Sequence, residues 1–220
     1  MALKLYFHPL SSFCWKVLIA LYEHDTPFTP QIVDLGNAAE SAAFKAVWPI
    51  RKFPVLRDEA NDRTIPESSM IIEYLDLHHP GRTPLVPADA ALAVQARLQD
   101  RIFDLYLNVP VGKVVTDRLR PAGANDPHGV AEAKATIRAA LGVVEADLST
   151  RNPAQGAWAV GDTFSLADCA AAPALFYANK VVPFETSHRH TMAYLDRLKQ
   201  RPSIARVIEE AQPYMKFFPV

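Results

Sequence analysis

The sequence contains only two cysteines, Cys14 and Cys169, which are too few for the disulfide framework of a small secreted domain. Two thiols can pair in principle, but so low a count fits a reducing cytoplasm. The chain opens without the charged and apolar regions of a signal peptide. No apolar run approaches the roughly 18 residues that a membrane-spanning helix needs. We therefore expect a soluble, cytoplasmic protein.

A strong charge of either sign is also missing. The 23 Lys and Arg residues and the 24 Asp and Glu residues leave a net charge of −1, which argues against nucleic-acid binding and against a polybasic membrane surface. The sequence has no phosphate-binding loop, no G-x-S-x-G elbow and no dinucleotide fingerprint. Its histidines and cysteines lack the spacing of metal ligands, so we expect no metal.

Apolar residues make up 50% of the 220 residues, enough for one large domain or two modest ones. Short apolar runs and helical periodicity alternate in the first part of the chain. The predicted order is strand, helix, strand, helix, two strands and helix, at residues 3–7, 13–24, 28–35, 38–47, 53–58, 63–65 and 66–79.

A proline-rich stretch with the composition of a linker follows, at residues 79–90. The rest of the chain has an almost entirely helical pattern. We expect a long helix over about 88–120, kinked at Pro110, because proline removes a hydrogen bond and clashes with the preceding turn. Further helices are predicted over about 126–150, 164–180, 188–200 and 202–211.

The stretch HPLSSFCW, residues 8–15, places Ser11 and Cys14 at the spacing of a C-x-x-C redox pair whose first sulfur has become a hydroxyl. Ser11 or Ser12 fits the N-cap of the following helix. The same geometry serves a second purpose, because a hydroxyl at a positive helix end can donate to a bound anion. If that anion is a thiolate, the contact lowers the pKa of the thiol. Both interpretations remain open at this point.

Two further motifs also have a structural and a functional interpretation. Pro54 either starts a strand or forms a cis peptide bond that turns the backbone of Phe53 toward an extended ligand. In TIPESSM, Thr64 and Glu67 fit a capping box. Alternatively, Glu67 accepts from an ammonium group and Ser68 receives a carboxylate, an arrangement suited to an α-amino acid head group.

The order of these motifs resembles that of the cytosolic glutathione transferases over essentially the whole chain. FPVL resembles the cis-proline turn of that family, and ESSMIIEYL its Glu/Gln-Ser motif. In GDTFSLADC, Ser165 and Asp168 resemble its structural capping motif. The resemblance implies an N-terminal thioredoxin-like α/β domain over residues 1–80, a linker over 81–88 and an all-helical domain over 89–220.

The resemblance also implies roles for particular residues. Ser11 aligns with the activating serine of the theta, zeta and tau classes, and Ser12 is the second candidate. The glutathione site would comprise Ser11, Lys52, Phe53, Pro54, Glu67 and Ser68, with Arg51 as the alternative to Lys52. Tyr106 and Val111, in the kinked helix, are our predictions for the pocket of the second substrate. Trp48-Pro49 stands where the family often has Asn-Pro, so the class stays open.

The implied function is detoxifying transfer of glutathione, as co-substrate, to small apolar electrophiles by a homodimeric enzyme. Two alternatives remain: a glutathione-dependent isomerase of the zeta (maleylacetoacetate) type, which the paired serines favour, and a non-catalytic interaction module of the same fold. A fourth interpretation is thiol–disulfide exchange through Cys14, against which stands the lack of a partner cysteine nearby in the sequence.

Overall fold

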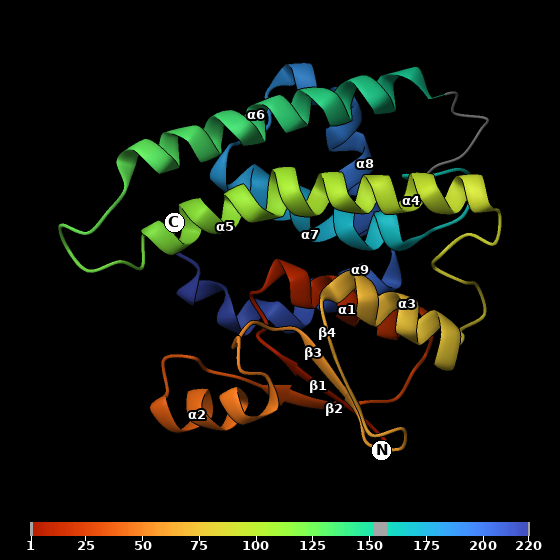
Figure 1. Ribbon diagram of the computed structural model, residues 1–220. Helices are drawn as coiled ribbons and strands as arrows, with labels where there is room; N and C mark the ends of the chain where they lie inside the picture. Colours follow the sequence, from red (N-terminus) through yellow and green to blue (C-terminus); the bar gives the residue numbers. More distant parts are fainter. Residues whose placement is uncertain (1, 152–157, 220) are drawn as a thin grey trace.

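The computed structural model describes residues 2–151 and 158–219, and shows an α/β domain below a layer of helices (Figure 1). A four-stranded sheet has the order β2-β1-β3-β4, in which β2 is parallel to β1 and the other pairs are antiparallel. The elements of this domain are β1 (Leu3–Phe7), α1 (Ser12–Glu23), β2 (Thr29–Ile32), α2 (Ala38–Val47), β3 (Val55–Asp58), β4 (Arg63–Pro66) and α3 (Ser68–His78).

The helical domain begins after a connection, residues 79–89, that contains no helix or strand. Its elements are α4 (Ala90–Ile102), the π-helix η1 (Phe103–Asn108), α5 (Val109–Asp117), α6 (Pro127–Thr150), α7 (Leu166–Val181), the short η3 (Thr186–His188), α8 (Arg189–Lys199), α9 (Pro202–Ala211) and the 3₁₀ segment η4 (Gln212–Phe217). The predicted fold class, a thioredoxin-like domain followed by a helical domain, is confirmed. No helix among the described residues is both long and apolar enough to cross a bilayer.

Helix α1 lies at the centre of the molecule and joins the two domains. Residues 14–21 are all buried, and α1 packs against α3, α7 and α9. Trp15 contacts the rings of Phe176 and Tyr177 in α7, with ring centroids 4.9 and 5.0 Å away. One continuous core therefore runs through both domains. On the opposite face of the sheet, α2 covers a small second core of Val33, Phe44 and Val55.

The region around Pro110 differs from the single kinked helix that we predicted. Helix α4 ends at Ile102, a π-helical segment follows, and α5 begins at Val109 with the proline in its first turn. Proline cannot donate to the preceding turn and its ring needs extra room there. The wider π-helical turn directly before Pro110 provides that room, so the irregularity lies ahead of the proline.

The capping box predicted for Thr64 and Glu67 is wrong. Thr64 belongs to β4, where it pairs with Arg57, and the strand continues to Pro66. Helix α3 therefore begins only at Ser68, and Glu67 occupies its N-cap position without a side-chain capping bond. The sequence pattern places Thr64 at the start of a helix, whereas in the structure its backbone pairs with β3 and extends the sheet.

Candidate functional site

Three segments of the chain meet at one end of the sheet. Strand β1 ends at Phe7, and Tyr6 lies opposite Val55, the first residue of β3. Val55 in turn lies opposite Pro66, the last residue of β4. The loop between β1 and α1, the residues before β3 and the start of α3 are therefore neighbours in space.

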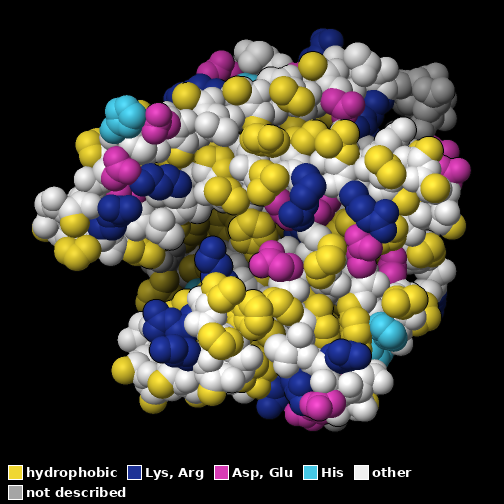
Figure 2. Space-filling view, viewed as in Figure 1, with side chains coloured by type: hydrophobic (Ala, Val, Ile, Leu, Met, Phe, Trp, Pro, Cys, Tyr) yellow, Lys and Arg dark blue, Asp and Glu magenta, His cyan; other side chains and the backbone are white. Residues whose placement is uncertain are grey.

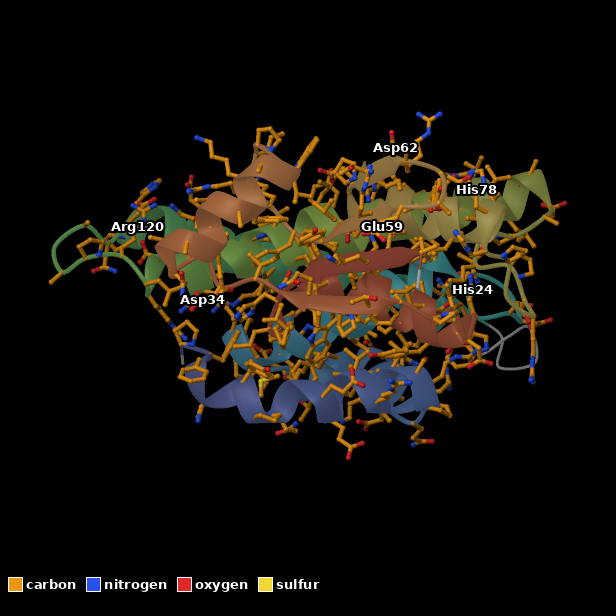
Figure 3. The ribbon with its side chains drawn as sticks, turned by 90° about the horizontal axis from the view of Figure 1, so that it is seen from below. His24, Asp34, Glu59, Asp62, His78 and Arg120 are labelled. Atoms are coloured by element: carbon orange, nitrogen blue, oxygen red, sulfur yellow. The ribbon has the colours of Figure 1, made fainter. Side chains whose placement is uncertain are left out.

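Helices α1 and α3 both begin at this end of the sheet and run away from it. His24 and His78, at the far ends of the two helices, lie together on one side of Figure 3, and Asp34, which follows β2, lies on the other. Each helix start carries unpaired N–H groups and a partial positive charge. Two positive helix ends therefore face the same region, which favours a ligand with two anionic groups.

Ser11 is the N-cap of α1, and its Oγ accepts from the backbone N of Cys14 at 3.4 Å. Such a long bond is weak, so the hydroxyl can reorient toward a ligand. Ser12 is the first helical residue. Cys14 is completely buried, and burial raises the pKa of its thiol to about 12 even though a hydrogen bond from Ser11 favours the thiolate. Cys14 is therefore not a nucleophile here.

Phe53 and Pro54 precede β3 and are joined by a cis peptide bond. Pro54 is buried, whereas Lys52, two residues earlier, is exposed. The ring of Phe53 stacks on His8 with centroids 5.9 Å apart. Burial lowers the pKa of His8, so its ring favours the neutral form, although Asp34 acts in the opposite direction. His8 was not among the predicted site residues, because a single histidine after a strand carries no sequence signal.

Glu67 and Ser68 stand at the start of α3. Glu67 is exposed and has a φ of +68°, a left-handed conformation that is uncommon for a residue with a side chain. Ser68 is buried in the first turn, where its backbone N–H has no carbonyl four residues earlier in the helix to bond. The start of α3 therefore carries both an exposed carboxyl group and free backbone N–H groups, the two features that an amino-acid head group requires.

A buried ion cluster stabilises the start of α3 on the side that faces α1 and α4. The ammonium group of Lys16 is 2.5 Å from Asp100 Oδ1 and 2.7 Å from Asp104 Oδ2, and it donates to Ser69 Oγ at 2.9 Å. Arg101 completes the cluster by donating to Ser69 and to both carboxylates. The side chain of Lys16 is 0% exposed. Two cations balance two anions, and Ser69 ties the first turn of α3 to α1 and α4.

Sequence reasoning missed this cluster. Its only signal was a lysine on the apolar side of α1 together with two aspartates four residues apart near the end of α4. The sequence alone could not show that these residues meet across a domain boundary.

The surface is hollowed between the two domains, beneath α5 and next to α2, and hydrophobic side chains line the hollow (Figure 2). Of the two residues predicted for a second-substrate pocket, Tyr106 lies in the π-helical segment and is 53% exposed. Val111 is 4% exposed and belongs to the main core. It presents little surface to any ligand.

Ser165 and Asp168 lie apart from this region and form a capping box at the start of α7. Asp168 accepts from the backbone N of Ser165 at 2.9 Å, from the backbone N of Ala159 at 2.7 Å and from the hydroxyl of Tyr194 at 2.6 Å. The aspartate is completely buried, and burial raises its pKa. This arrangement organises the helical domain and offers nothing to a ligand. Across residues 2–151 and 158–219, no group of His, Cys, Asp and Glu could hold a metal ion.

Comparison with known families gives two matches. The family described as "Glutathione S-transferase, N-terminal domain" matches residues 5–83, and "Glutathione S-transferase, C-terminal domain" matches residues 88–202.

Individual proteins give consistent similarities. A probable maleylacetoacetate isomerase from Caenorhabditis elegans is 29% identical over 189 residues, which cover 84% of this chain and 85% of that protein. FtsZ-localized protein A from Caulobacter vibrioides is 29% identical over 218 residues, 95% of this chain and 92% of that protein. A glutathione S-transferase from Methylobacterium radiotolerans, solved in complex with glutathione sulfonate, is 28% identical with a TM-score of 0.79, and the match covers 93% of each chain.

Proposed function

Because the chain belongs to the glutathione S-transferase family, we propose that it is an enzyme that joins the thiolate of glutathione to small apolar electrophiles. The observation that carries this proposal is the meeting of two helix starts and the residues before β3 at one end of the sheet, next to an apolar hollow. Glutathione supplies two anionic groups to these helix starts, its thiolate and its γ-glutamyl carboxylate. The hollow would receive the electrophile.

In this mechanism Ser11 donates its hydroxyl to the thiolate of glutathione. The contact stabilises the charged form and lowers the pKa of the bound thiol, so that more nucleophile is present at neutral pH. A negative ion accepts a hydrogen bond more strongly than the neutral thiol of Cys14, so a bound thiolate would draw the hydroxyl proton toward itself.

The remaining predicted residues would hold the tripeptide in place. The backbone of Phe53, oriented by Pro54, would pair with the cysteinyl unit. Glu67 would accept from the γ-glutamyl ammonium group, and the start of α3 at Ser68 would bind its carboxylate. Lys52 would face the glycine carboxylate. Tyr106 would border the electrophile, and binding both reactants side by side raises their effective concentration.

Ser11→Ala tests the proposed role of the hydroxyl. With a halogenated nitroaromatic substrate, kcat/KM should fall tenfold or more, which corresponds to about 1.4 kcal/mol, while the KM for glutathione changes less. The remaining activity should rise at a higher pH than in wild type, because the bound thiol loses the contact that lowers its pKa. The matched control is Ser12→Ala. If Ser12→Ala shows the loss and Ser11→Ala does not, the role belongs to Ser12; if neither variant loses activity, serine activation is refuted.

A second candidate is a glutathione-dependent isomerase. The adjacent serines Ser11 and Ser12 and the similarity to a probable maleylacetoacetate isomerase favour it. Turnover of a maleylacetoacetate-type substrate without turnover of halogenated aromatics would establish this alternative. A third candidate is a non-catalytic interaction module, since one relative is named for its localisation with FtsZ. Failure of the chain to bind immobilised glutathione would favour that candidate over both enzymes.

We further propose that the protein works as a homodimer in the cytoplasm. Both cysteines are free and buried, which suits a reducing compartment. Helices α3 and α4 are joined by the Glu73–Arg97 ion pair and expose large apolar side chains, namely Met70, Leu77, Val94 and Leu98. One of them, Met70, lines a groove of about 700 Å³ together with residues that include Ile65 and Tyr74.

An exposed apolar surface of this kind fits a second copy of the chain. Leu98→Glu should shift the species seen by analytical ultracentrifugation to the monomer, and Val143→Glu, an equally exposed site on α6, should not. A monomeric wild-type protein would refute the homodimer.

A further inference from the structure

A separate cavity of about 330 Å³ lies between the edge strand β2 and helix α9, beside α1. In Figure 3 the C-terminal helices run alongside the strands that form one wall of this region. Ser11, Phe53 and Ser68 are not among the described residues that line it. The described residues that line it come from β1 and the loop after it, α1, β2 and its approach, α9 and η4, and include Phe7, Leu18, Tyr22, Phe28, Ile32 and Val207.

Aromatic rings dominate the walls of this cavity. Tyr22 and Phe28 lie with their centroids 6.1 Å apart, and Phe7 and Tyr214 line the cavity as well. The guanidinium of Arg206 lies 3.9 Å from the centroid of the Tyr22 ring. Flat rings pack against aromatic walls through offset and edge contacts, so a flat aromatic molecule fits this space better than a branched aliphatic one. The volume lies at the lower end of the range for small-molecule sites.

One wall carries three polar groups that already contact one another. The hydroxyl of Tyr22 donates to Glu210 Oε2 at 2.6 Å, and Nε of Arg206 donates to Glu210 Oε1 at 2.8 Å. The carboxylate keeps further lone pairs, and the guanidinium keeps further N–H donors. Burial and the neighbouring Glu210 raise the pKa of Tyr22, which keeps its hydroxyl protonated.

The charges on this wall select against an ionic ligand. Arg206 and Glu210 neutralise each other at the half-exposed rim of the cavity, so Glu210 would repel a bound anion and Arg206 would repel a bound cation. A neutral hydroxyl avoids both conflicts, because it can donate to the carboxylate and accept from the guanidinium at once.

We propose that this cavity is a second binding site, which takes a neutral, flat, hydroxylated aromatic molecule of about two fused rings. The aromatic body fills the space between β2 and α9, and the hydroxyl group bonds to the Arg206–Glu210 pair. The site does not depend on the proposed glutathione chemistry, since it shares none of the residues assigned to it.

The test is a fluorescence titration of the full chain with 2-naphthol, naphthalene and 2-naphthoate. We expect one 2-naphthol per chain, bound about tenfold or more tightly than either of the other two compounds. Saturating S-hexylglutathione, whose alkyl chain would fill the hollow next to the proposed glutathione site, should leave this affinity unchanged. Competition with S-hexylglutathione would place the compound in the hollow between the domains and overturn the proposal, as would the absence of saturable 2-naphthol binding.

Two matched variants locate the site. Ile32 is 39% exposed at the rim of the cavity, so Ile32→Trp fills the space without disturbing the core. Val143→Trp adds the same side chain at a position on α6 that is 57% exposed. Ile32→Trp should weaken 2-naphthol binding at least tenfold with an unchanged urea midpoint, whereas Val143→Trp should bind like wild type. Equal affinities of the two variants would refute the location.

A third variant tests the ligand class. Glu210→Ala removes the acceptor for the hydroxyl group, so 2-naphthol should lose its advantage over naphthalene. If 2-naphthoate binds wild-type protein as tightly as 2-naphthol, the preference for a neutral hydroxyl is refuted.

Discussion

Replacing Lys16 by Met should destabilise the protein far more than the loss of an ordinary surface ion pair. The Lys16 side chain is fully buried, and its ammonium group serves both Asp100 and Asp104. In Lys16→Met, Arg101 is left to balance two buried carboxylates, and its own side chain is 46% exposed. Removing one partner of a buried ion pair costs about 3–5 kcal/mol, because the other charge stays buried without compensation.

Urea unfolding followed by circular dichroism measures this loss directly. Lys199→Met is the matched control, because it breaks an exposed pair with Asp196 on α8, away from the proposed dimer surface, and should cost less than about 1 kcal/mol. The pH dependence gives a second readout. Burial raises the pKa of Asp104, and loss of Lys16 raises it further, so the folded variant takes up a proton at a higher pH than folded wild type does. The difference in unfolding free energy between wild type and Lys16→Met should therefore narrow as the pH is lowered from neutral into the acid range.

Two results would refute this reasoning. If Lys16→Met loses no more stability than Lys199→Met, the cluster does not act as a buried ionic unit. If the gap between Lys16→Met and wild type stays constant over that pH range, uncompensated carboxylates are not the cause of the loss.

Asp168→Ala should lower the free energy of unfolding by about 3 kcal/mol or more in urea titrations. The buried groups that donate to Asp168, among them the Tyr194 hydroxyl, lose their acceptor in this variant. A loss as small as that for an exposed Asp would contradict this prediction. Burial lowers the pKa of His8 from 6.5, so the unfolded chain binds the extra proton and stability should fall as the pH drops below about 6.5. In His8→Phe the fall should be smaller, and an identical pH profile would rule out His8 as a source. Iodoacetamide near neutral pH should leave Cys14 unmodified in the folded chain and label it in urea, as measured by mass spectrometry. The reason is that burial raises the pKa of the Cys14 thiol to about 12. Rapid labelling of the folded chain would instead support the thiol–disulfide interpretation.

Local patterns in the sequence predicted the elements well where the deciding interactions are themselves local. The alanine-rich helix over 38–47 was predicted at the bounds that α2 has, since Asn37 caps it from the adjacent position. The start of α7 was found for the same reason, because Ser165 and Asp168 are three residues apart and bond to each other. The capping box predicted for Thr64 was wrong because the residue that pairs with Thr64, Arg57, lies on another strand.

The sequence by itself determined the two-domain order, the helix and strand pattern and the serine at the first helix start, because periodicity and capping act within a few residues. Tertiary structure alone decided that Lys16 meets Asp100 and Asp104, that Val111 lies in the core, and that β2 and α9 enclose a cavity. These contacts join segments far apart in the chain. Which side chains meet across such distances depends on how whole elements pack together, and no local spacing encodes it.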